Sequence, residues 1–261
     1  MRSIVLLALL SVLEPVIGLA LMIPLYIYPG DNATAWGSVV EVVSQHPKVK
    51  FQIIINPNSG PGDSDYPDAN FITGVSKLNS FANVVLFGYV DTAYTDRALS
   101  DVNSDVETYA GWSSYPKANI SLSGIFFDDV IDSNTSAAYG YMTNVSATAK
   151  SYLRSVIFNP GTVVDARYFN LADVIIEYED SLANYIFPQT MAAMTKGKHK
   201  QISIIANHAK PPQTRINSLV TNMMAGNIGS MYLTSDCCYQ QVNATLLKAV
   251  TNKIAALQRS R

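Results

Sequence analysis

Two adjacent carboxylates, Asp128 and Asp129, directly follow an apolar stretch of the sequence that reads GIFF. Like charges at this separation raise the pKa of one of the two groups, which suits a general acid or a general base. Neighbouring residues of a regular strand point to opposite faces, so only one of the pair would face a shared site unless the chain turns there. The alternative is that one of them caps a helix or braces a loop.

A second acidic segment, DVIIEYED at 173–180, carries Glu177 and Glu179. Residues two apart on a strand share a face, so we expect both side chains on one side of a sheet, with Glu179 nearer its end. Two carboxyl groups across a sugar ring can protonate the leaving oxygen and assist attack at the anomeric carbon. The acidic segments therefore predict glycoside hydrolysis, and the separation of the carboxyl groups would decide between retention and inversion.

The elements that must position these groups repeat as a strand followed by a helix. Eight β-rich apolar runs end in polar or turn residues, at 22–28, 49–55, 83–90, 124–128, 155–158, 173–178, 201–206 and 230–233. Between and after them lie segments expected to be helical, at 35–44, 69–79, 101–112, 136–153, 166–171, 183–194, 213–224 and 240–257. The spacing between the fifth and sixth strands is short, so its helix should have only a turn or two.

Eight such units predict a single (β/α)₈ TIM barrel over residues 21–261. The competing architecture is an open doubly wound sheet, but no glycine-rich phosphate motif follows any strand. In a TIM barrel the chemistry lies at the carboxyl ends of the strands. Polar and aromatic residues near these ends could contact a sugar, although each also has a structural explanation. The candidates for substrate binding are Tyr28, Asn56, Tyr89, Asp91, Asn159 and His208.

The composition excludes several classes of function. The chain has 18 basic and 20 acidic residues, a net charge of −2, so it lacks the basic excess that nucleic-acid binding needs. Three histidines without an HExxH motif and two cysteines predict no metal site, and no cofactor is expected. The cysteines are the neighbours Cys237 and Cys238, which could form a vicinal disulfide ring, remain free thiols or bridge to another chain.

The first twenty residues, MRSIVLLALLSVLEPVIGLA, have the layout of a secretory signal peptide cleaved after Gly18 or Ala20. The alternative is a buried first helix or strand. Glu14 and Pro15 leave the apolar run too short to span a bilayer, and no membrane association is expected. Glycosylation sequons also favour a secreted, extracellular or cell-wall protein; they start at Asn32, Asn119, Asn134, Asn144 and Asn243.

Several segments, in order along nearly the whole chain, resemble the spherulin 4 family, which is also called spherulation-specific family 4. They are IPLYIYPG (23–30), INPNSGPG (55–62), GYVDTAYTDR (88–97), SGIFFDDV (123–130), FNPGT (158–162) and ADVIIEYEDS (172–181). The family includes secreted fungal glycoside hydrolases that cut galactosaminogalactan, an α-1,4-linked polymer of galactose, N-acetylgalactosamine and galactosamine. The resemblance implies a (β/α)₈ barrel and cleavage within the polymer at N-acetylgalactosamine residues.

The resemblance also implies catalytic roles for Asp128, Asp129 and Glu179, rather than Glu177. The second acid of the family pair is usually Glu, where this chain has Asp129, and Asp180 stands where Gly is common. In the working mechanism Glu179 is the general acid, Asp128 stabilises or attacks the oxocarbenium-like centre, and Asp129 assists as a base or binds the sugar amine. The acid and nucleophile roles could be exchanged.

The expected partner is an amino-sugar-containing polysaccharide, bound by a monomer. Two alternatives stay open. One is a non-catalytic, secreted wall or matrix protein that binds polysaccharide, which the change at Asp129 favours. The other is a hydrolase acting on a different glycan.

Overall fold

The computed structural model describes residues 18–259, and its eight parallel strands close into one barrel in chain order. Neighbouring strands pair in sequence, and the barrel closes where Ala20 and Leu21 pair with Ser230 and Met231. The predicted TIM barrel is therefore confirmed. The strands are β1 (Ala20–Leu25), β2 (Phe51–Ile55), β3 (Val84–Asp91), β4 (Gly124–Asp128), β5 (Ser155–Phe158), β6 (Val174–Ser181), β7 (Ile202–Asn207) and β8 (Ser230–Leu233).

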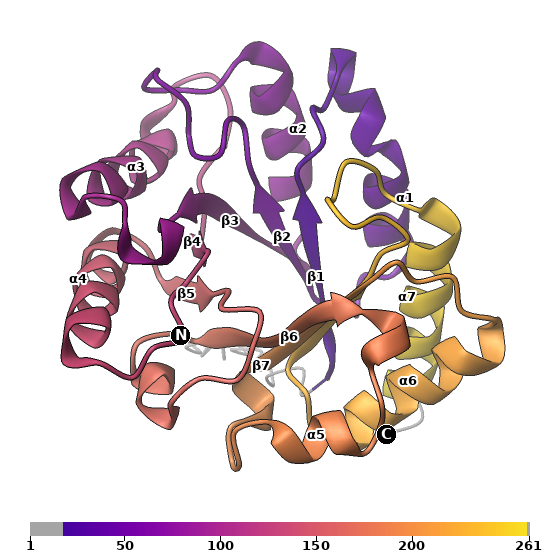
Figure 1. Ribbon diagram of the computed structural model, residues 1–261. Helices are drawn as coiled ribbons and strands as arrows, with labels where there is room; N and C mark the ends of the chain where they lie inside the picture. Colours follow the sequence, from indigo (N-terminus) through magenta and orange to yellow (C-terminus); the bar gives the residue numbers. More distant parts are fainter. Residues whose placement is uncertain (1–17, 260–261) are drawn as a thin grey trace, which may run out of the picture.

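The helices surround the strands and cover the outside of the barrel (Figure 1). The α-helices are α1 (Gly37–Gln45), α2 (Ala69–Asn79), α3 (Leu99–Gly111), α4 (Ser136–Tyr152), α5 (Gln189–Ala193), α6 (Gln213–Ala225) and α7 (Ala244–Arg259). Short 3₁₀ helices complete the set: η1 (Asp31–Trp36), η2 (Ala93–Thr95), η3 (Trp112–Ser114), η4 (Ala166–Asn170), η5 (Leu182–Asn184) and η6 (His199–Gln201).

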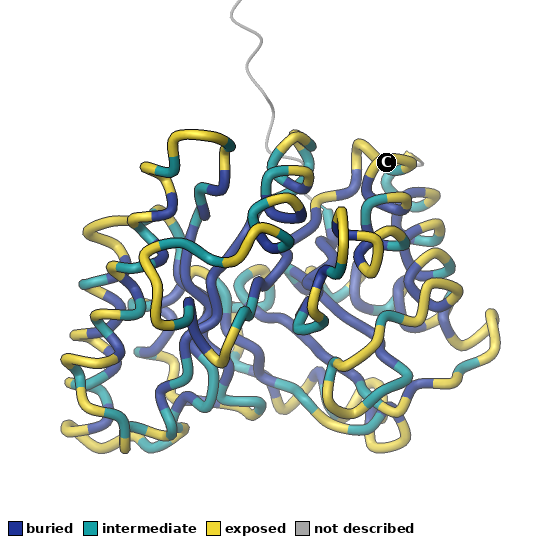
Figure 2. Tube along the Cα trace, turned by 90° about the horizontal axis from the view of Figure 1, so that it is seen from above, coloured by how far each residue is buried: buried dark blue, intermediate teal, exposed yellow. Residues whose placement is uncertain are grey.

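The burial pattern explains why the strand sequences are apolar at nearly every position. Every residue of β1, β2 and β8 is buried, because one face of each strand packs inside the barrel and the other against the helices. Figure 2 shows buried chain along the strands in the middle and exposed chain along the outer helices and loops. This packing fixes the strand ends from which the site is built.

Several boundaries differ from the predicted ones. The sector between β5 and β6 holds only the five-residue η4, as its short spacing predicted. The helix predicted at 183–194 is broken into η5 and α5, separated by a cis peptide bond between Phe187 and Pro188. The predicted helix at 240–257 begins only at Ala244, where Asn243 accepts a hydrogen bond from the Leu246 amide.

The predicted signal segment lies mostly outside the described residues, since 1–17 are not among them. Leu19 is buried, and the Ala20 amide donates to the Gly229 carbonyl at 2.9 Å. Cleavage after Gly18 would leave β1 whole, whereas cleavage after Ala20 would remove its first residue. Within 18–259, no helix combines the length and the apolar character that crossing a bilayer requires.

Candidate active site

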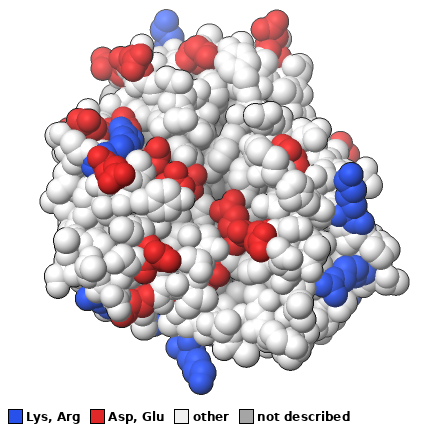
Figure 3. Space-filling view, viewed as in Figure 1, with Lys and Arg blue, Asp and Glu red and all other residues white. Residues whose placement is uncertain are grey.

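A cavity of about 380 Å³ opens at the carboxyl ends of the strands. Figure 3 shows a hollow near the centre of this face, bordered by acidic side chains, with the basic ones lying away from it. None of the described residues that line the cavity is basic. The lining comprises Pro24, Tyr26, Tyr94, Phe126, Asp128, Asp129, Asn159, Pro160, Gly161, Thr162, Glu179, Ile205 and Tyr239.

Asp128 and Asp129 both line the cavity because the chain turns between them. Asp128 is the last residue of β4, and Asp129 has left the strand with a positive φ of 47°. Side-chain alternation, which would separate two neighbours on a strand, no longer applies there. The turn is held by Thr92, whose hydroxyl donates to the carbonyls of Asp128 and Asp129 at 2.9 and 2.8 Å.

Asn159 follows β5 and connects the two acidic segments. Its Nδ2 donates to Asp128 Oδ1 at 2.7 Å and to Glu179 Oε2 at 2.6 Å. Its Oδ1 accepts from the Gly161 amide at 3.1 Å, so the nitrogen side of the side-chain amide faces the carboxylates. Gly161 has φ 66°, a conformation that favours glycine, and its carbonyl accepts from the Glu179 amide at 2.9 Å.

Glu179 reaches the cavity and Glu177 does not. The pairing of β6 with β7 shifts register between Ile176 and Tyr178, and this irregularity breaks the alternation along β6. Glu177 is 3% exposed, and its carboxylate accepts from the Thr195 amide at 2.8 Å and from the Thr195 hydroxyl at 2.5 Å. The expectation that Glu177 and Glu179 share a face is therefore wrong.

The surroundings of the cavity raise the pKa of Asp128 and of two neighbouring tyrosines. Burial and the charge of Glu179 raise the pKa of Asp128 to about 7, against the opposing hydrogen bonds from Asn159 and Tyr89. Burial, followed by the charge of Asp128, raises the pKa of Tyr89. A hydrogen bond to Asp129 raises the pKa of Tyr94 to about 12. The phenols therefore remain protonated donors, and the Asp128 carboxyl keeps its proton up to about pH 7.

Most of the other residues predicted to contact a sugar lie outside the cavity lining. Tyr89 is hydrogen-bonded to Asp128 and stacks on Phe126, a lining residue, with ring centroids 5.9 Å apart. Of the predicted contact residues, Asn159 lines the cavity. The others are not among the lining residues: Tyr28, Asn56, Tyr89, Asp91 and His208.

Their own contacts explain this separation. Asn56 Oδ1 accepts from the Gly60 amide at 3.2 Å, and Asp91 Oδ1 accepts from the Ala93 amide at 2.7 Å, so both side chains shape loops. His208 is exposed on the loop after β7 and has φ 49°. Tyr28 contacts α2 instead, because its hydroxyl accepts from Asn70 Nδ2 at 2.9 Å.

Sequence reasoning missed Tyr26 and Tyr239. The predicted first strand, 22–28, includes Tyr26, but β1 ends at Leu25 and Tyr26 lines the cavity just beyond it. The segment LYIY at 25–28 carried that signal, because Tyr26 and Tyr28 are two residues apart at the end of the apolar run. Tyr239 lies well beyond β8 in a loop without regular structure, where no strand-end rule would find it. Its hydroxyl donates to Glu179 Oε1.

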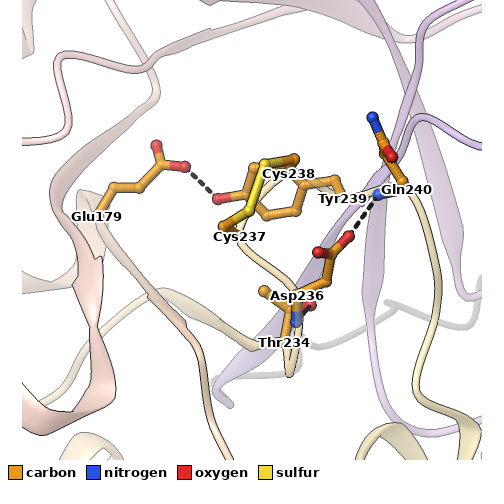
Figure 4. The surroundings of a disulfide bond; sticks show 7 residues. All are labelled: Glu179, Thr234, Asp236, Cys237, Cys238, Tyr239 and Gln240. Atoms are coloured by element: carbon orange, nitrogen blue, oxygen red, sulfur yellow. Dashed lines mark hydrogen bonds between the residues drawn. A yellow bond between two sulfur atoms is a disulfide. The ribbon is translucent and has the colours of Figure 1, made fainter.

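The loop after β8 also carries the two cysteines, which form the vicinal disulfide Cys237–Cys238. Of the three alternatives left open by the sequence, this one is present. Figure 4 shows Tyr239, the next residue, pointing from this loop toward Glu179. The disulfide therefore lies next to a residue of the cavity wall.

Comparisons with known proteins agree with this architecture. The family model described as spherulation-specific family 4 matches residues 20–253. Spherulin-4 from Physarum polycephalum is 34% identical over 251 residues, which cover 91% of this chain and 70% of that protein. The crystal structure of Aspergillus clavatus Sph3 in complex with GalNAc has a TM-score of 0.83 at 27% identity, covering 91% of this chain and 98% of Sph3.

A more distant similarity concerns the fold alone. The GH18 chitinase ChiB of Flavobacterium johnsoniae has a TM-score of 0.58 at 10% identity, covering 92% of this chain and 95% of that chain.

Proposed function

The chain belongs to spherulation-specific family 4, and on that basis we propose that it is a secreted glycoside hydrolase. Its proposed substrate is an α-1,4-linked polysaccharide containing N-acetylgalactosamine, of the galactosaminogalactan type, cut within the chain. The observation that carries this proposal is the joining of Asp128 and Glu179 by one Asn159 amide in an open cavity. The GalNAc complex of Sph3, at 27% identity, supports the choice of sugar.

The environments of the two carboxyl groups favour Asp128 as the general acid. Its pKa, raised to about 7, keeps a proton available at mildly acidic and neutral pH. Glu179 accepts hydrogen bonds from Asn159 and Tyr239, and such donors stabilise a carboxylate charge. This exchanges the acid and nucleophile roles of the working mechanism drawn from the sequence.

The spacing of the pair favours retention of configuration. Asp128 Oδ1 and Glu179 Oε2 lie 2.7 and 2.6 Å from the same nitrogen, Asn159 Nδ2. The distance between these two oxygens therefore cannot exceed the sum of the two hydrogen-bond distances. Retaining enzymes place their carboxyl groups about 5 Å apart, whereas inverting enzymes leave room for a water molecule at about 6.5 Å or more.

The proposed reaction takes two steps. Glu179 attacks the anomeric carbon while Asp128 gives its proton to the departing glycosidic oxygen. Water then attacks the same carbon, gives a proton to Asp128 and releases Glu179. In an α-linked N-acetylgalactosamine the acetamido group is cis to the leaving oxygen and cannot attack from behind, so a protein carboxylate has to do so.

Asp129 is proposed to recognise the sugar rather than to break the bond. Its carboxylate is hydrogen-bonded to the hydroxyl of Tyr94, whose ring is 57% exposed at the mouth. The absence of basic side chains from the described lining leaves its negative charge free to attract a cation. A galactosamine residue with a free amine would supply that cation.

A second hollow, of about 210 Å³, is proposed as a more distant sugar subsite. Tyr28, Tyr66 and the loop 57–68 line it. Tyr28 is 54% exposed, yet its ring is fixed by the hydrogen bond from Asn70 and by edge-on packing with Phe71 at 5.6 Å. A rigid, exposed ring of this kind provides a platform for a sugar face.

Secretion and glycosylation complete the proposal. The signal segment supports export, and every sequon asparagine is exposed in the structure, so each is accessible to a glycan: Asn32, Asn119, Asn134, Asn144 and Asn243.

The test is incubation of the protein with galactosaminogalactan, with chitosan and chitin as control polymers. We expect new reducing ends and shorter oligosaccharides from galactosaminogalactan, with the newly formed ends first appearing as the α-anomer by NMR. Binding without new reducing ends would favour the non-catalytic polysaccharide-binding alternative. Activity on a control polymer alone would assign the enzyme to another glycan.

A further inference from the structure

Tyr239 forms part of the cavity wall and contacts Glu179 directly. Its hydroxyl donates to Glu179 Oε1, the oxygen that Asn159 does not bind. Its ring packs edge-on against Tyr26, with centroids 5.5 Å apart. The phenol therefore fixes one end of a carboxylate whose other end is fixed by an amide.

The backbone that carries Tyr239 has few restraints of its own. The loop is anchored on either side, since the Asp236 amide donates to Thr234 Oγ1 at 3.1 Å and the Gln240 amide to Asp236 Oδ2 at 2.8 Å. Between these anchors, residues 237–239 make no backbone hydrogen bond to any described part of the chain. Tyr239 also has φ 57°, which is unfavourable for a residue with a side chain.

The Cys237–Cys238 disulfide is the covalent restraint on this stretch. Both cysteines are exposed, so a reductant in solution can reach them. Figure 4 shows the disulfide immediately before Tyr239 in the loop that reaches toward Glu179. Breaking the disulfide would free the backbone to leave the positive-φ conformation at Tyr239, and the Tyr239 phenol would move with the backbone.

We propose that Tyr239 is a positioning residue for Glu179 and that the Cys237–Cys238 disulfide holds it there, which makes the site sensitive to reduction. The predicted loss of rate rests on the proposed function, whereas the contact between Tyr239 and Glu179 does not. In the reductive step a phosphine attacks one sulfur and breaks the S–S bond. The phosphine takes oxygen from water and becomes a phosphine oxide, and the two water protons end on the two sulfurs.

The experiment compares the wild type with Tyr239→Phe and with the double variant Cys237→Ala, Cys238→Ala, each before and after phosphine treatment. Tyr239→Phe keeps the ring packing and removes only the hydroxyl. The first readout is NMR of protein labelled at tyrosine Cζ, in which the Tyr239 line is assigned by its absence from Tyr239→Phe. The second is kcat and KM on galactosaminogalactan.

We expect reduction to shift the Tyr239 line toward that of a solvent-exposed tyrosine and to lower kcat by about tenfold, the effect of losing one hydrogen bond to a charged group. KM should stay within about twofold. Tyr239→Phe should lose about the same factor and respond no further to phosphine. The double variant should behave as the reduced wild type; if it does not fold, reduction of the wild type makes the same test.

An unmoved Tyr239 line after complete reduction would overturn the proposal. An equal loss of rate on reducing wild type and Tyr239→Phe would do so as well, because the disulfide would then act elsewhere. If the oxidised wild type releases no reducing ends, the proposed function fails, and the NMR comparison still decides the role of the disulfide.

Discussion

Asp128 and Glu179 share one hydrogen-bond donor, the Nδ2 of Asn159, which lies 2.7 Å from Asp128 Oδ1 and 2.6 Å from Glu179 Oε2. The Gly161 amide occupies the other end of the Asn159 side chain, so the donor cannot turn away without losing a second hydrogen bond. The two carboxyl groups are thus held at a fixed separation before any substrate arrives. Such preorganisation saves the reorganisation that would otherwise slow the chemical step.

Replacement Asn159→Asp should test this shared donor. The variant keeps the shape of the side chain, but it removes the donor and adds a third negative charge beside Asp128. We expect kcat to fall by about 100-fold, because a misplaced reacting group costs a factor of this size. The added charge should also raise the pKa of Asp128 further, so the alkaline limb of the pH–rate profile should move to higher pH. An unchanged profile would mean that the bridge does not tune Asp128.

The two glutamates of β6 provide a matched pair of variants. Glu179→Gln should lower kcat by about 1,000-fold or more, because the variant lacks the carboxylate proposed to attack the anomeric carbon. The melting temperature should be nearly unchanged, because this side chain lines the open cavity. Glu177→Gln should leave kcat within about threefold but lower the free energy of unfolding by about 1–3 kcal/mol, because it disturbs a buried bonded carboxylate. Kinetics and thermal melts of both variants would check this, and equal losses of activity would contradict the assignment.

The rate of cleavage should fall as pH rises through about 7. Asp128 must be protonated to act as the acid, and its pKa is raised to about 7 by burial and by the charge of Glu179. The pH dependence of kcat/KM would report this limb. A profile that stays flat to pH 9 would exclude Asp128 as the acid.

Stability should respond to the same proton. The unfolded carboxyl loses its proton near the ordinary value of 3.8, whereas the folded one keeps it to about 7, so the folded state binds more protons between these values. The contribution of Asp128 to stability therefore decreases as pH rises through that window. Asp128→Asn should remove this part of the pH dependence, which melting temperatures at pH 4.5 and 7.5 would measure against the wild type.

Asp129 should affect recognition more than bond cleavage. Asp129→Asn removes the charge proposed to attract a free amine, so KM should rise about 5- to 20-fold for polymer rich in galactosamine. The change should be within about twofold for fully N-acetylated polymer, which serves as the control. Asp129→Glu keeps the charge and should retain the preference. Equal effects of Asp129→Asn on both polymers would argue against the amine contact.

Tyr28 should matter for long substrates alone. Tyr28→Ala removes the exposed ring from the second hollow, and we expect KM for the polymer to rise by about 3- to 10-fold, the loss of one stacking contact. Cleavage of the shortest oligosaccharide that is a substrate should not change, because it would not reach that hollow. Tyr152→Ala, which removes another exposed tyrosine from a helix of the outer layer, is the control. A loss that is equal for short and long substrates would contradict the subsite.

The sequence by itself determined the barrel and the strands that end in acidic residues. Periodicity and turn residues are local properties, and a run such as GIFF followed by Asp128 identifies a buried strand and its polar end without reference to the rest of the chain. The carboxyl ends of parallel strands meet at one mouth, so the meeting of Asp128 with Glu179 also followed from the pattern.

The tertiary structure decided which side chains reach the cavity. Asp129 has a positive φ, so its side chain lies in the cavity with that of Asp128 instead of on the opposite face. The register shift before Tyr178 breaks the alternation along β6, so Glu177 binds Thr195 and does not line the cavity. The Tyr239 contact is made from a loop that carries a disulfide between neighbouring residues, and no local pattern encodes the reach of this loop to β6. Such features arise from pairing and packing between segments far apart in the chain, which the sequence of one strand does not contain.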